Sequence, residues 1–445
     1  MSMRIIVCSL ILFSLNSRKA CRAQDSAALP VKWDLQTCLD YAKKNNIQIN
    51  TLRLTEKNTE QEYELSKAAT LPNLTGSLNH TYTHSKNVNP VVGGFQTQSS
   101  FAGNYSLNST VTLYHGGYYM NDIRQKNLEI ESANLNILQS ENDITLQITQ
   151  AYLNILLAKE NIIYIHDLLA TTQAQVDQGQ KQYDAGSIAR NALIELQAQL
   201  ANDKYTLVTA QNTERQNKLT LKQILQLPTS TAFDIVKPDT VIATEAVASL
   251  DTVESAALRT RPEIKNGLLG IEIARYDLLK ARSGYLPSLT ASGTLSSGYS
   301  NNLKDAYFKQ LDDNFFQQIG LGLSIPIFTR RVVRTNVELA KIEMEQAALN
   351  LKGTKTALAQ EIEQAYINVE NAQAQYDAAV EELNATRESF RIAGEELKVG
   401  AVNTVNYLQQ KTLYTQAFQA YIQAKYNSAL SVKIYDFYMG IAVKL

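Results

Sequence analysis

Histidine and cysteine are the side chains with the widest chemical repertoire, and this 445-residue chain has four histidines and three cysteines. His80 and His84 fall on one face of a predicted strand with Tyr82 between them, and we interpret them as residues at the rim of a sheet. His115 and His166 have no cysteine or acidic cluster at ligand spacing. These residues therefore predict no metal centre.

Motifs for phosphate binding and nucleophilic catalysis are also missing. The sequence has no Gly-x-x-x-x-Gly-Lys loop, no Gly-x-Ser-x-Gly elbow and no paired carboxylates in a loop. Gly320-x-Gly322 lies within a strand pattern and indicates close packing. The formal charge of −1, from 42 Lys and Arg against 43 Asp and Glu, gives no reason to expect nucleic acid. We therefore expect no enzyme and no cofactor, so the function must depend on the architecture.

The first 23 residues resemble a secretory signal peptide. Arg4 supplies the positive start, residues 5–15 the apolar stretch, and Cys21-Arg22-Ala23 a cleavage site. Lipidation of Cys21 remains an alternative, although the basic residues at positions 18 and 19 fit a lipobox poorly. After this segment there is no run of about 18 apolar residues that would form a membrane-spanning helix. An exported chain of this kind is either soluble or a β-barrel.

The rest of the chain contains an internal duplication. Pro72 in Leu-Pro-Asn-Leu and Pro287 in Leu-Pro-Ser-Leu are 215 residues apart. Gln-Ala-Tyr-Leu-Asn at 150–154 matches Gln-Ala-Tyr-Ile-Asn at 364–368 with an offset of 214, and Gly186 matches Gly400 with the same offset. Register kept over more than a hundred residues indicates duplication, and with only 8 prolines and 19 glycines the chain has room for very long helices.

Each half has the same order of predicted elements. The predicted domains are a signal peptide at 1–23, a first repeat at 24–228, a linker at 229–250 and a second repeat at 251–445. The first repeat has a helical stretch at 34–70, strands at 74–85 and 101–114, and long helices at 118–183 and 188–226. The second has a helical stretch at 251–283, strands at 289–300 and 315–328, and long helices at 331–398 and 402–438.

The strand segments alternate between apolar residues and small polar residues, with almost no charges on the polar face. An apolar exterior with a polar interior is typical of membrane β-barrels. Aromatic residues near the strand ends are predicted to form an interfacial belt: Tyr82, Phe101, Tyr105, Tyr114, Tyr299 and Phe315. Four strands cannot close a barrel around water, so the chain must oligomerise. Three copies would give twelve strands, and physics alone also allows two or four.

The long helices carry a coiled-coil seam with alternating spacings of four and three residues. In the first repeat its members are Ile144, Ile148, Ala151, Ile155, Ala158, Ile162, Ile165 and Leu169. In the second they are Leu358, Ile362, Ala365, Val369, Ala372, Tyr376, Ala379 and Leu383. A helix of about 65 residues is roughly 100 Å long, enough to cross an aqueous gap. A structural coiled-coil protein of the envelope is the alternative that the helices alone leave open.

The order of these features, present twice, resembles the TolC-like outer-membrane efflux protein family over essentially the whole mature sequence. The motifs that carry the resemblance are Leu-Pro before each strand pair, Ile325-Pro326-Ile327-Phe328, and the segment 404–409 after the glycine turn. It implies a mixed α and β membrane fold: a homotrimer whose twelve-stranded outer-membrane β-barrel, four strands per chain, continues into a long periplasmic α-helical coiled-coil barrel. It implies a passive exit duct that carries small toxic molecules out of the periplasm.

The resemblance also implies the partners and the working ends of the duct. The partners would be outer-membrane lipid, a periplasmic adaptor (membrane fusion) protein and an inner-membrane pump. The adaptor would dock at the helix tips, whose residues are Gly186, Ser187, Gly400 and Ala401. The periplasmic entrance would be formed by Asn403, Thr404, Asn406, Gln409 and Glu195. An exit duct for type I protein secretion remains an alternative, because the pump selects the cargo.

One departure from the family pattern concerns the charge of this entrance. In the best-known relative, an acidic pair follows the second tip glycine, and the corresponding residues here are Asn406 and Gln409. The first-repeat equivalents are Ala192 and Glu195, so Glu195 is the nearest remaining acid. We therefore expect an entrance lined by amides, with weaker attraction for cations than a carboxylate ring would have.

Overall fold

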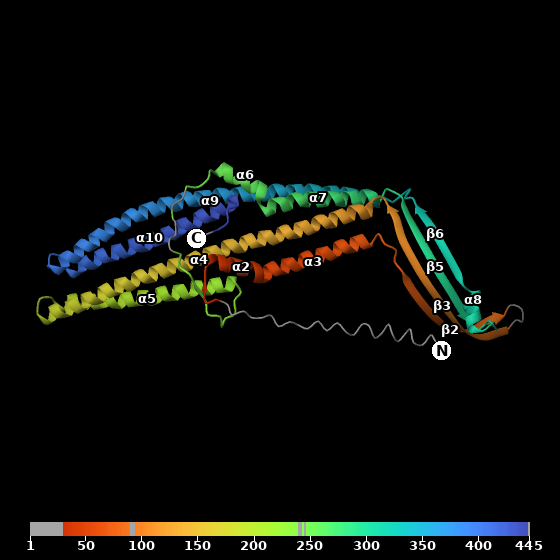
Figure 1. Ribbon diagram of the computed structural model, residues 1–445, viewed down its shortest axis with the longest axis horizontal. Coiled ribbons are helices and arrows are strands. Elements are labelled where there is room, and N and C mark those ends of the chain that lie inside the picture. Colours follow the sequence, from red (N-terminus) through yellow and green to blue (C-terminus); the bar gives the residue numbers. More distant parts are fainter. Residues whose placement is uncertain (1–29, 90–93, 239–242, 244–245, 444–445) are drawn as a thin grey trace.

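The computed structural model describes residues 30–89, 94–238, 243 and 246–443. The predicted signal peptide, the question of Cys21 lipidation and part of the predicted linker lie outside the described residues. Figure 1 shows an elongated molecule with a sheet at one end and long helices that run away from it. Among the described residues, no helix is both long and apolar enough to cross a membrane.

The sheet has four antiparallel strands in the order β2-β3-β5-β6. Their bounds are Thr75–Asn89, Gly94–His115, Ser288–Ser300 and Phe316–Ser324, respectively. The β2–β3 hairpin is longer than predicted, and its outer part extends beyond Ser300, where β5 ends. The strand predicted at 315–328 is shorter, because β5 begins at Ser288 opposite Ser324 and offers no partner to the residues that follow.

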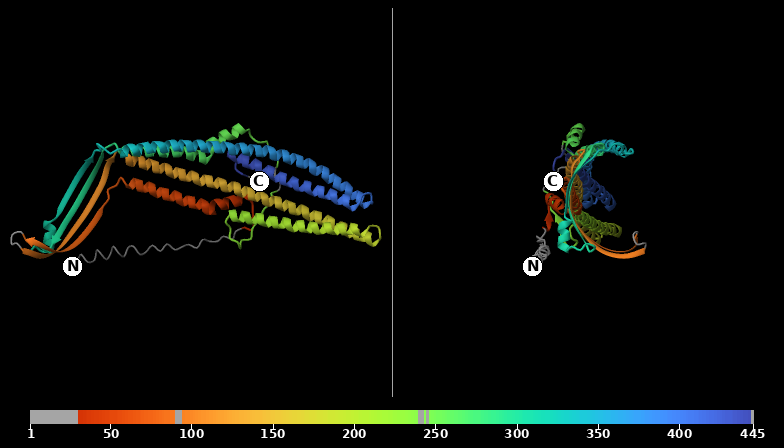
Figure 2. Two further views of the ribbon diagram at one scale, coloured as in Figure 1. Left: turned by 180° about the vertical axis from the view of Figure 1, so that it is seen from behind. Right: turned by 90° about the vertical axis from the view of Figure 1, so that its right-hand side faces the viewer.

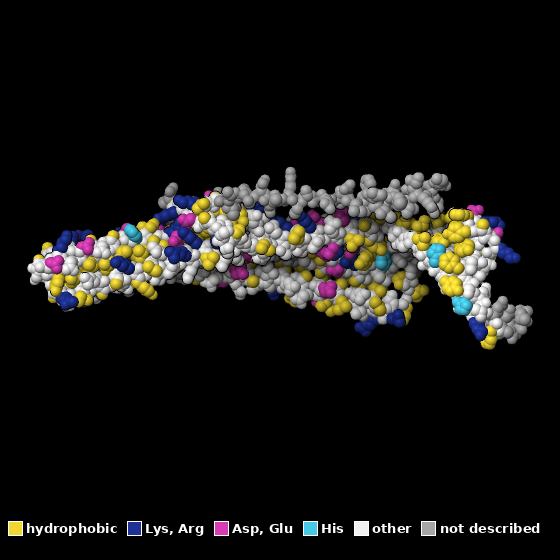
Figure 3. Space-filling model, turned by 90° about the horizontal axis from the view of Figure 1, so that it is seen from below, with side chains coloured by type: hydrophobic (Ala, Val, Ile, Leu, Met, Phe, Trp, Pro, Cys, Tyr) yellow, Lys and Arg dark blue, Asp and Glu magenta, His cyan; other side chains and the backbone are white. Residues whose placement is uncertain are grey.

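The pairing register separates an apolar face from a polar face, as the period-two alternation predicts. Leu78 lies opposite Tyr105, and Leu107 lies opposite Leu295. The other face carries hydroxyls and amides that bond across strands, such as Ser77 with Ser106 at 2.7 Å. In the isolated chain the apolar face is largely uncovered, and Ile319 is 91% exposed. Figure 3 shows hydrophobic and histidine side chains gathered on the sheet.

The helical part is a wall that is four helices wide at every level. Next to the sheet the order is α3 (Ile47–Ala68), α4 (Tyr118–Asp184), α7 (Pro262–Ser283) and α9 (Val332–Lys398). Farther away the order is α5 (Arg190–Ile224), α4, α10 (Thr404–Met439) and α9. Thus α4 and α9 run through both levels, and α9 is an edge throughout (Figures 1 and 2).

Both helical stretches that precede the strands consist of two helices rather than the single one expected. In the first, α2 (Leu35–Asn45) ends at Asn46, whose side chain caps α3 by accepting hydrogen bonds from the amides of Gln48 and Ile49. In the second, α6 (Leu250–Thr260) ends at Arg261, and Pro262 begins α7. Proline has no amide hydrogen and disfavours helix in the preceding residue, so it separates the two helices.

The largest hydrophobic core lies midway along the helices, around a two-stranded parallel sheet that was not predicted. This sheet pairs β1 (Lys32–Trp33) with β4 (Asp234–Ile235). The Tyr152 hydroxyl donates to the carbonyl of Val236 at 2.6 Å, which fixes the inter-repeat connection to α4. The predicted seam is confirmed: six of its eight residues in α4 are buried, as are all of those in α9 except Tyr376.

The turn that joins each strand pair to its long helix is duplicated in shape but not in sequence. Gly116 and Gly117 have φ of +57° and +80°, and the residues 214 positions later, Arg330 and Arg331, have φ of +48° and +70°. Positive φ is unstrained for glycine but costs on the order of 1–3 kcal/mol for other residues. The second repeat therefore places two arginines in a backbone conformation that favours glycine.

A pair of alanine substitutions separates two requirements of the first turn, namely a positive φ and the absence of a Cβ at Gly116. A Cβ on Gly116 would lie 2.7 Å from the Ser283 carbonyl, whereas a Cβ on Gly117 would meet only Asn121 at 3.8 Å. We expect Gly116→Ala to lower the melting temperature of the purified oligomer in detergent clearly more than Gly117→Ala, which adds strain alone. Equal shifts for the two variants would contradict the steric argument.

Candidate entrance at the helix tips

Each long helix ends in a glycine turn of the same design. In the first repeat Gly186 has φ of +72°, and the Ser187 amide donates to the Gln182 carbonyl at 2.8 Å. In the second, Gly400 has φ of +76°, and the Ala401 amide donates to the Glu396 carbonyl at 2.9 Å. This pattern is the Schellman motif, which needs a left-handed residue and therefore favours glycine. These tip residues are exposed.

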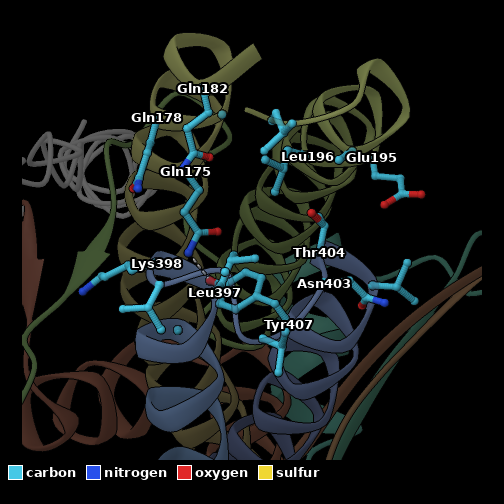
Figure 4. Close-up of a pocket in the computed structure, with 18 of the residues that line it drawn as sticks. Gln175, Gln178, Gln182, Glu195, Leu196, Leu397, Lys398, Asn403, Thr404 and Tyr407 are labelled. Carbon is cyan, nitrogen blue, oxygen red and sulfur yellow. Dashed lines mark hydrogen bonds between the residues drawn. The ribbon is translucent and has the colours of Figure 1, made fainter. Parts of the chain in front are cut away.

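The two tips of one chain border a cleft of about 1010 Å³ between the α4–α5 hairpin and the α9–α10 hairpin. Figure 4 shows side chains from both hairpins facing this gap. The predicted residues among its lining are Ser187, Glu195, Gly400, Asn403 and Thr404. Sequence reasoning missed other polar lining residues, namely Gln175, Gln178, Gln182, Arg391 and Lys398. These lie on the long helices, and only the pairing of the hairpins brings them together.

The other predicted entrance residues differ from this group. Asn406 and Gln409 are not among the lining residues of the cleft, although Asn406 lies between the lining residues Val405 and Tyr407, and both are exposed in the first two turns of α10. Asn403 has a structural task, since its side chain accepts a hydrogen bond from the Asn406 amide at 2.9 Å and caps α10. Thr404 is buried beside it. The predicted set is therefore divided between residues that line the cleft and exposed residues of α10 that do not.

Behind the cleft, a buried polar network joins the two hairpins. The Lys411 ammonium on α10 is 2.5 Å from Asp203 Oδ2 on α5 and 2.6 Å from the Thr172 hydroxyl on α4. Gln199 donates to the second carboxylate oxygen of Asp203 at 2.7 Å. Lys411 is 2% exposed, and burial lowers its pKa, against which Asp203 acts. A buried charge of this kind requires its partner.

Further contacts join α4 to α10 on both sides of this network, and we call this line of contacts the α4–α10 seam. Nearer the tips, Gln175 donates to the Tyr407 hydroxyl, and burial raises the pKa of Tyr407 to about 12. In the other direction, the rings of Tyr164 and Phe418 stack with centroids 3.7 Å apart. The seam thus alternates polar bonds with aromatic packing.

Farther from the tips, Glu160 accepts hydrogen bonds from Lys425 at 3.0 Å and from Tyr426 at 2.7 Å. Burial would raise the pKa of Glu160, but these two hydrogen bonds outweigh it and the pKa lies below its ordinary value. The carboxylate is therefore charged at neutral pH and holds α10 against α4.

The predicted aromatic belt divides between the two ends of the sheet. Near the outer end, the rings of Phe101 and Tyr299 meet with centroids 6.4 Å apart, and Tyr82 lies opposite Phe101 in the register. Tyr105 lies close by, and Phe315 is exposed just before β6. Tyr114 is at the other end, where an irregularity in the register after Thr112 pairs it with Leu289 on the apolar face.

The histidines do not converge on a metal site. His80 stacks on Phe101 with centroids 5.4 Å apart, and His84 is hydrogen-bonded to the Ser99 hydroxyl at 2.8 Å. Within the part of the chain that the structure describes, no group of three or more histidine, cysteine or acidic side chains could hold a metal ion. Cys38 is buried in the central core, and burial raises its pKa to about 12.

A strand sheet with an apolar exterior, joined to a long helical wall with turns at its far end, defines an outer-membrane channel subunit. The sequence matches the outer membrane efflux protein family model over residues 38–226 and 253–433, once per repeat. The chain belongs to the outer membrane efflux protein family. Its members are outer-membrane channels of Gram-negative bacteria and not enzymes, and they are trimeric and work with efflux-pump components.

Curated relatives are distant but span most of the chain. It is 22% identical to the outer membrane efflux protein BepC of Brucella suis over 88% of this chain and 82% of the relative. It is 20% identical to the proteases secretion protein PrtF of Dickeya chrysanthemi over 87% of this chain and 84% of the relative. The fold matches the outer membrane protein VceC of Vibrio cholerae with a TM-score of 0.76 at 16% identity. The match covers 91% of this chain and 96% of VceC.

The buried Lys411–Asp203 pair yields a stability prediction. Removing one partner of a buried ion pair costs about 3–5 kcal/mol, whereas replacing both by apolar residues is often neutral. We expect Lys411→Met to lower the melting temperature of the oligomer, because Asp203 is left buried without its cation. The double variant Lys411→Met with Asp203→Leu should recover most of the loss. A single variant as stable as the wild type would contradict the assignment.

Proposed function

We propose that this protein is the homotrimeric exit duct of a tripartite efflux pump and carries small toxic molecules from the periplasm to the exterior. A periplasmic adaptor and an inner-membrane pump complete the assembly. The adaptor docks on the exposed tip residues Gly186, Ser187, Gly400 and Ala401, and the pump supplies the energy. The duct itself performs no chemical step.

The observation that carries a closed ring of subunits is that every level of the chain has two free edges, and membership of a family of trimeric channels sets the number at three. In the sheet these are β2 and β6, whose outer backbone groups have no strand partner among the described residues. In lipid such groups must be paired, which a closed ring of subunits achieves. In the helical wall the edges are α9 on one side and α3 or α5 on the other.

These helical edges are apolar on the side that faces away from the chain. Exposed residues recur along one face of α9: Val332, Leu339, Ile342 and Leu349. They recur on α3 and α5 as well: Ile47, Leu54, Leu65, Ile194, Tyr205, Val208 and Leu219. On each helix these residues lie opposite the buried ones, as expected of a helix with neighbours on both sides. A second copy of the same wall would cover them.

The choice of cargo rests on the named relatives and on the entrance. BepC and PrtF have nearly equal identity to this chain, and PrtF is named for protease secretion, so identity alone favours neither cargo. We favour small molecules because the family model that matches both repeats is that of outer membrane efflux proteins, and BepC is also named an efflux protein. Type I protein secretion is the alternative, and the experiment below distinguishes the two.

A deletion strain with plasmid complementation tests the proposal. Loss of the gene should raise the accumulation of several toxic compounds and leave the secreted-protein profile unchanged, and the wild-type gene should restore export. Leu339→Lys with Ile342→Lys, which places charges on the α9 edge, should assemble poorly and fail to restore it. As a control, Ala348→Lys, which places a charge on an exposed position of α9 away from this face, should restore export. An altered secreted-protein profile with normal accumulation would favour protein secretion instead.

The amide composition of the proposed entrance gives a prediction for conductance. If Asn406 and Gln409 ring the entrance, divalent cations have no ring of six carboxylates to bind. We expect weak block of single-channel conductance by added divalent cations. Asn406→Asp with Gln409→Glu should introduce a strong block that weakens as the pH falls and the carboxyls become protonated. Strong block of the wild-type channel would contradict the proposed entrance.

A further inference from the structure

The connection between β5 and β6 contains a short helix that the sequence did not predict. This helix, α8 (Tyr307–Asp313), lies beside the outer end of the sheet (Figures 1 and 2). The β2–β3 hairpin differs, because its strands continue as far as Asn89 and Gly94. The two repeats therefore end differently at the extracellular side.

Helix α8 takes the place of a strand along the last residues of β5. Pairing between β5 and β6 begins at Ser296 opposite Phe316, so residues 297–300 have no strand on that side. The Ser300 amide instead donates to the Gln310 side chain at 2.9 Å, and the Asn314 side chain donates to the Gly298 carbonyl at 2.8 Å. Gln310 is almost fully buried and also donates to the Asp305 carbonyl at 2.6 Å.

A second set of contacts places α8 on the apolar face of the sheet. The Tyr307 hydroxyl donates to the Tyr105 hydroxyl at 3.0 Å, and the Tyr307 ring lies 5.0 Å from that of Tyr299. The Ser297 hydroxyl donates to the Leu311 carbonyl at 2.6 Å. Tyr105, Ser297 and Tyr299 belong to the face that carries Leu107 and Leu295, which faces lipid in an outer-membrane channel.

The position of α8 along the strand sets its depth in the membrane. Strand β5 begins at Ser288 on the helical side, and α8 contacts it from Ser297 to Ser300. About 9–11 tilted residues cross the hydrocarbon layer, so this contact lies where the outer leaflet meets its headgroups. A helix that satisfies the edge of β5 at this depth meets the requirement that no backbone group remain unpaired in lipid.

Phe308 is the most exposed of the large hydrophobic side chains of α8. Phe308 is 75% exposed, next to Tyr307, with the two ring centroids 5.3 Å apart. Lys309, the next residue, forms an exposed ion pair with Asp305 at 2.8 Å. An aromatic ring beside a charged pair is the arrangement of an interfacial element, with the ring in the acyl region and the charges among headgroups.

We propose that α8 is an interfacial anchor that inserts Phe308 into the outer leaflet, while Gln310 and the residue that follows the helix, Asn314, pair backbone groups on the free edge of β5. The partner is the lipid at the boundary between acyl chains and headgroups. The proposal needs the channel to sit in the outer membrane but is independent of its cargo. It assigns a membrane-binding role to a connection that would otherwise be a solvent-exposed loop.

Fluorescence quenching in lipid vesicles tests this anchor. The only tryptophan of the chain, Trp33, is buried in the central core, so a wild-type measurement supplies a constant background. Phe308→Trp is compared with Phe95→Trp, a matched substitution of a residue that is 71% exposed on the β2–β3 hairpin beyond the end of β5. Full-length protein is reconstituted in dioleoylphosphatidylcholine vesicles with or without brominated acyl chains, and its oligomeric state and conductance are checked first.

The anchor predicts that brominated chains lower the added emission of the Phe308→Trp variant about twofold, with a blue-shifted maximum. Aqueous iodide should instead quench the Phe95→Trp variant preferentially. Iodide quenching that is equally strong in the two variants would overturn the proposal. So would blue-shifted emission of the Phe308→Trp variant that brominated lipid leaves unchanged, since that result would indicate a subunit contact. Either outcome with normal conductance would leave the proposed exit duct intact and reject only the anchor.

Discussion

The need to pair every backbone amide and carbonyl in lipid is the constraint on which the rest of this structure depends. A chain with only four strands has two free sheet edges, so it is incomplete in the membrane without neighbouring subunits. The helical wall follows the same width, four helices at each level, which lets one ring of subunits close sheet and wall together. Where β6 is too short to cover β5, the side chains of Gln310 and Asn314 pair the Ser300 amide and the Gly298 carbonyl.

Duplication explains this constant width, and the differences between the two repeats explain where the structure is irregular. Each repeat supplies two strands and one long helix that reaches from the sheet to the tips, α4 or α9. The two repeats differ in sequence at a turn whose backbone has positive φ, a conformation that favours glycine. Gly116 and Gly117 correspond to Arg330 and Arg331, which share the positive φ, so the fold keeps the turn although the arginines do not favour it. The tips, by contrast, have glycine at both 186 and 400.

Features set by local sequence could be predicted from the chain alone. Alternation of period two gave the sheet faces, the four-three spacing gave the buried seam around Ile148 and Ile362, and the tip glycines marked the turns. Features set by distant pairing could not. Lys411 and Asp203 are 208 residues apart, and neither has a sequence pattern that distinguishes it from a surface charge. Helix α8 has only seven residues, too few for a periodic signal.

The α4–α10 seam sets the energetic cost of changing the cleft between the two tips. Separating the hairpins within one chain would expose the stacked rings of Tyr164 and Phe418 and break the hydrogen bond between Gln175 and Tyr407. It would also part Lys411 from Asp203 and Thr172, which are held within 2.6 Å of its ammonium group. The outer faces of α3, α5 and α9 instead carry exposed apolar residues, whose packing against a neighbour is less directional than a buried ion pair. The contact between the two hairpins of one chain is therefore more specific in its geometry than the apolar edges that would join one chain to the next.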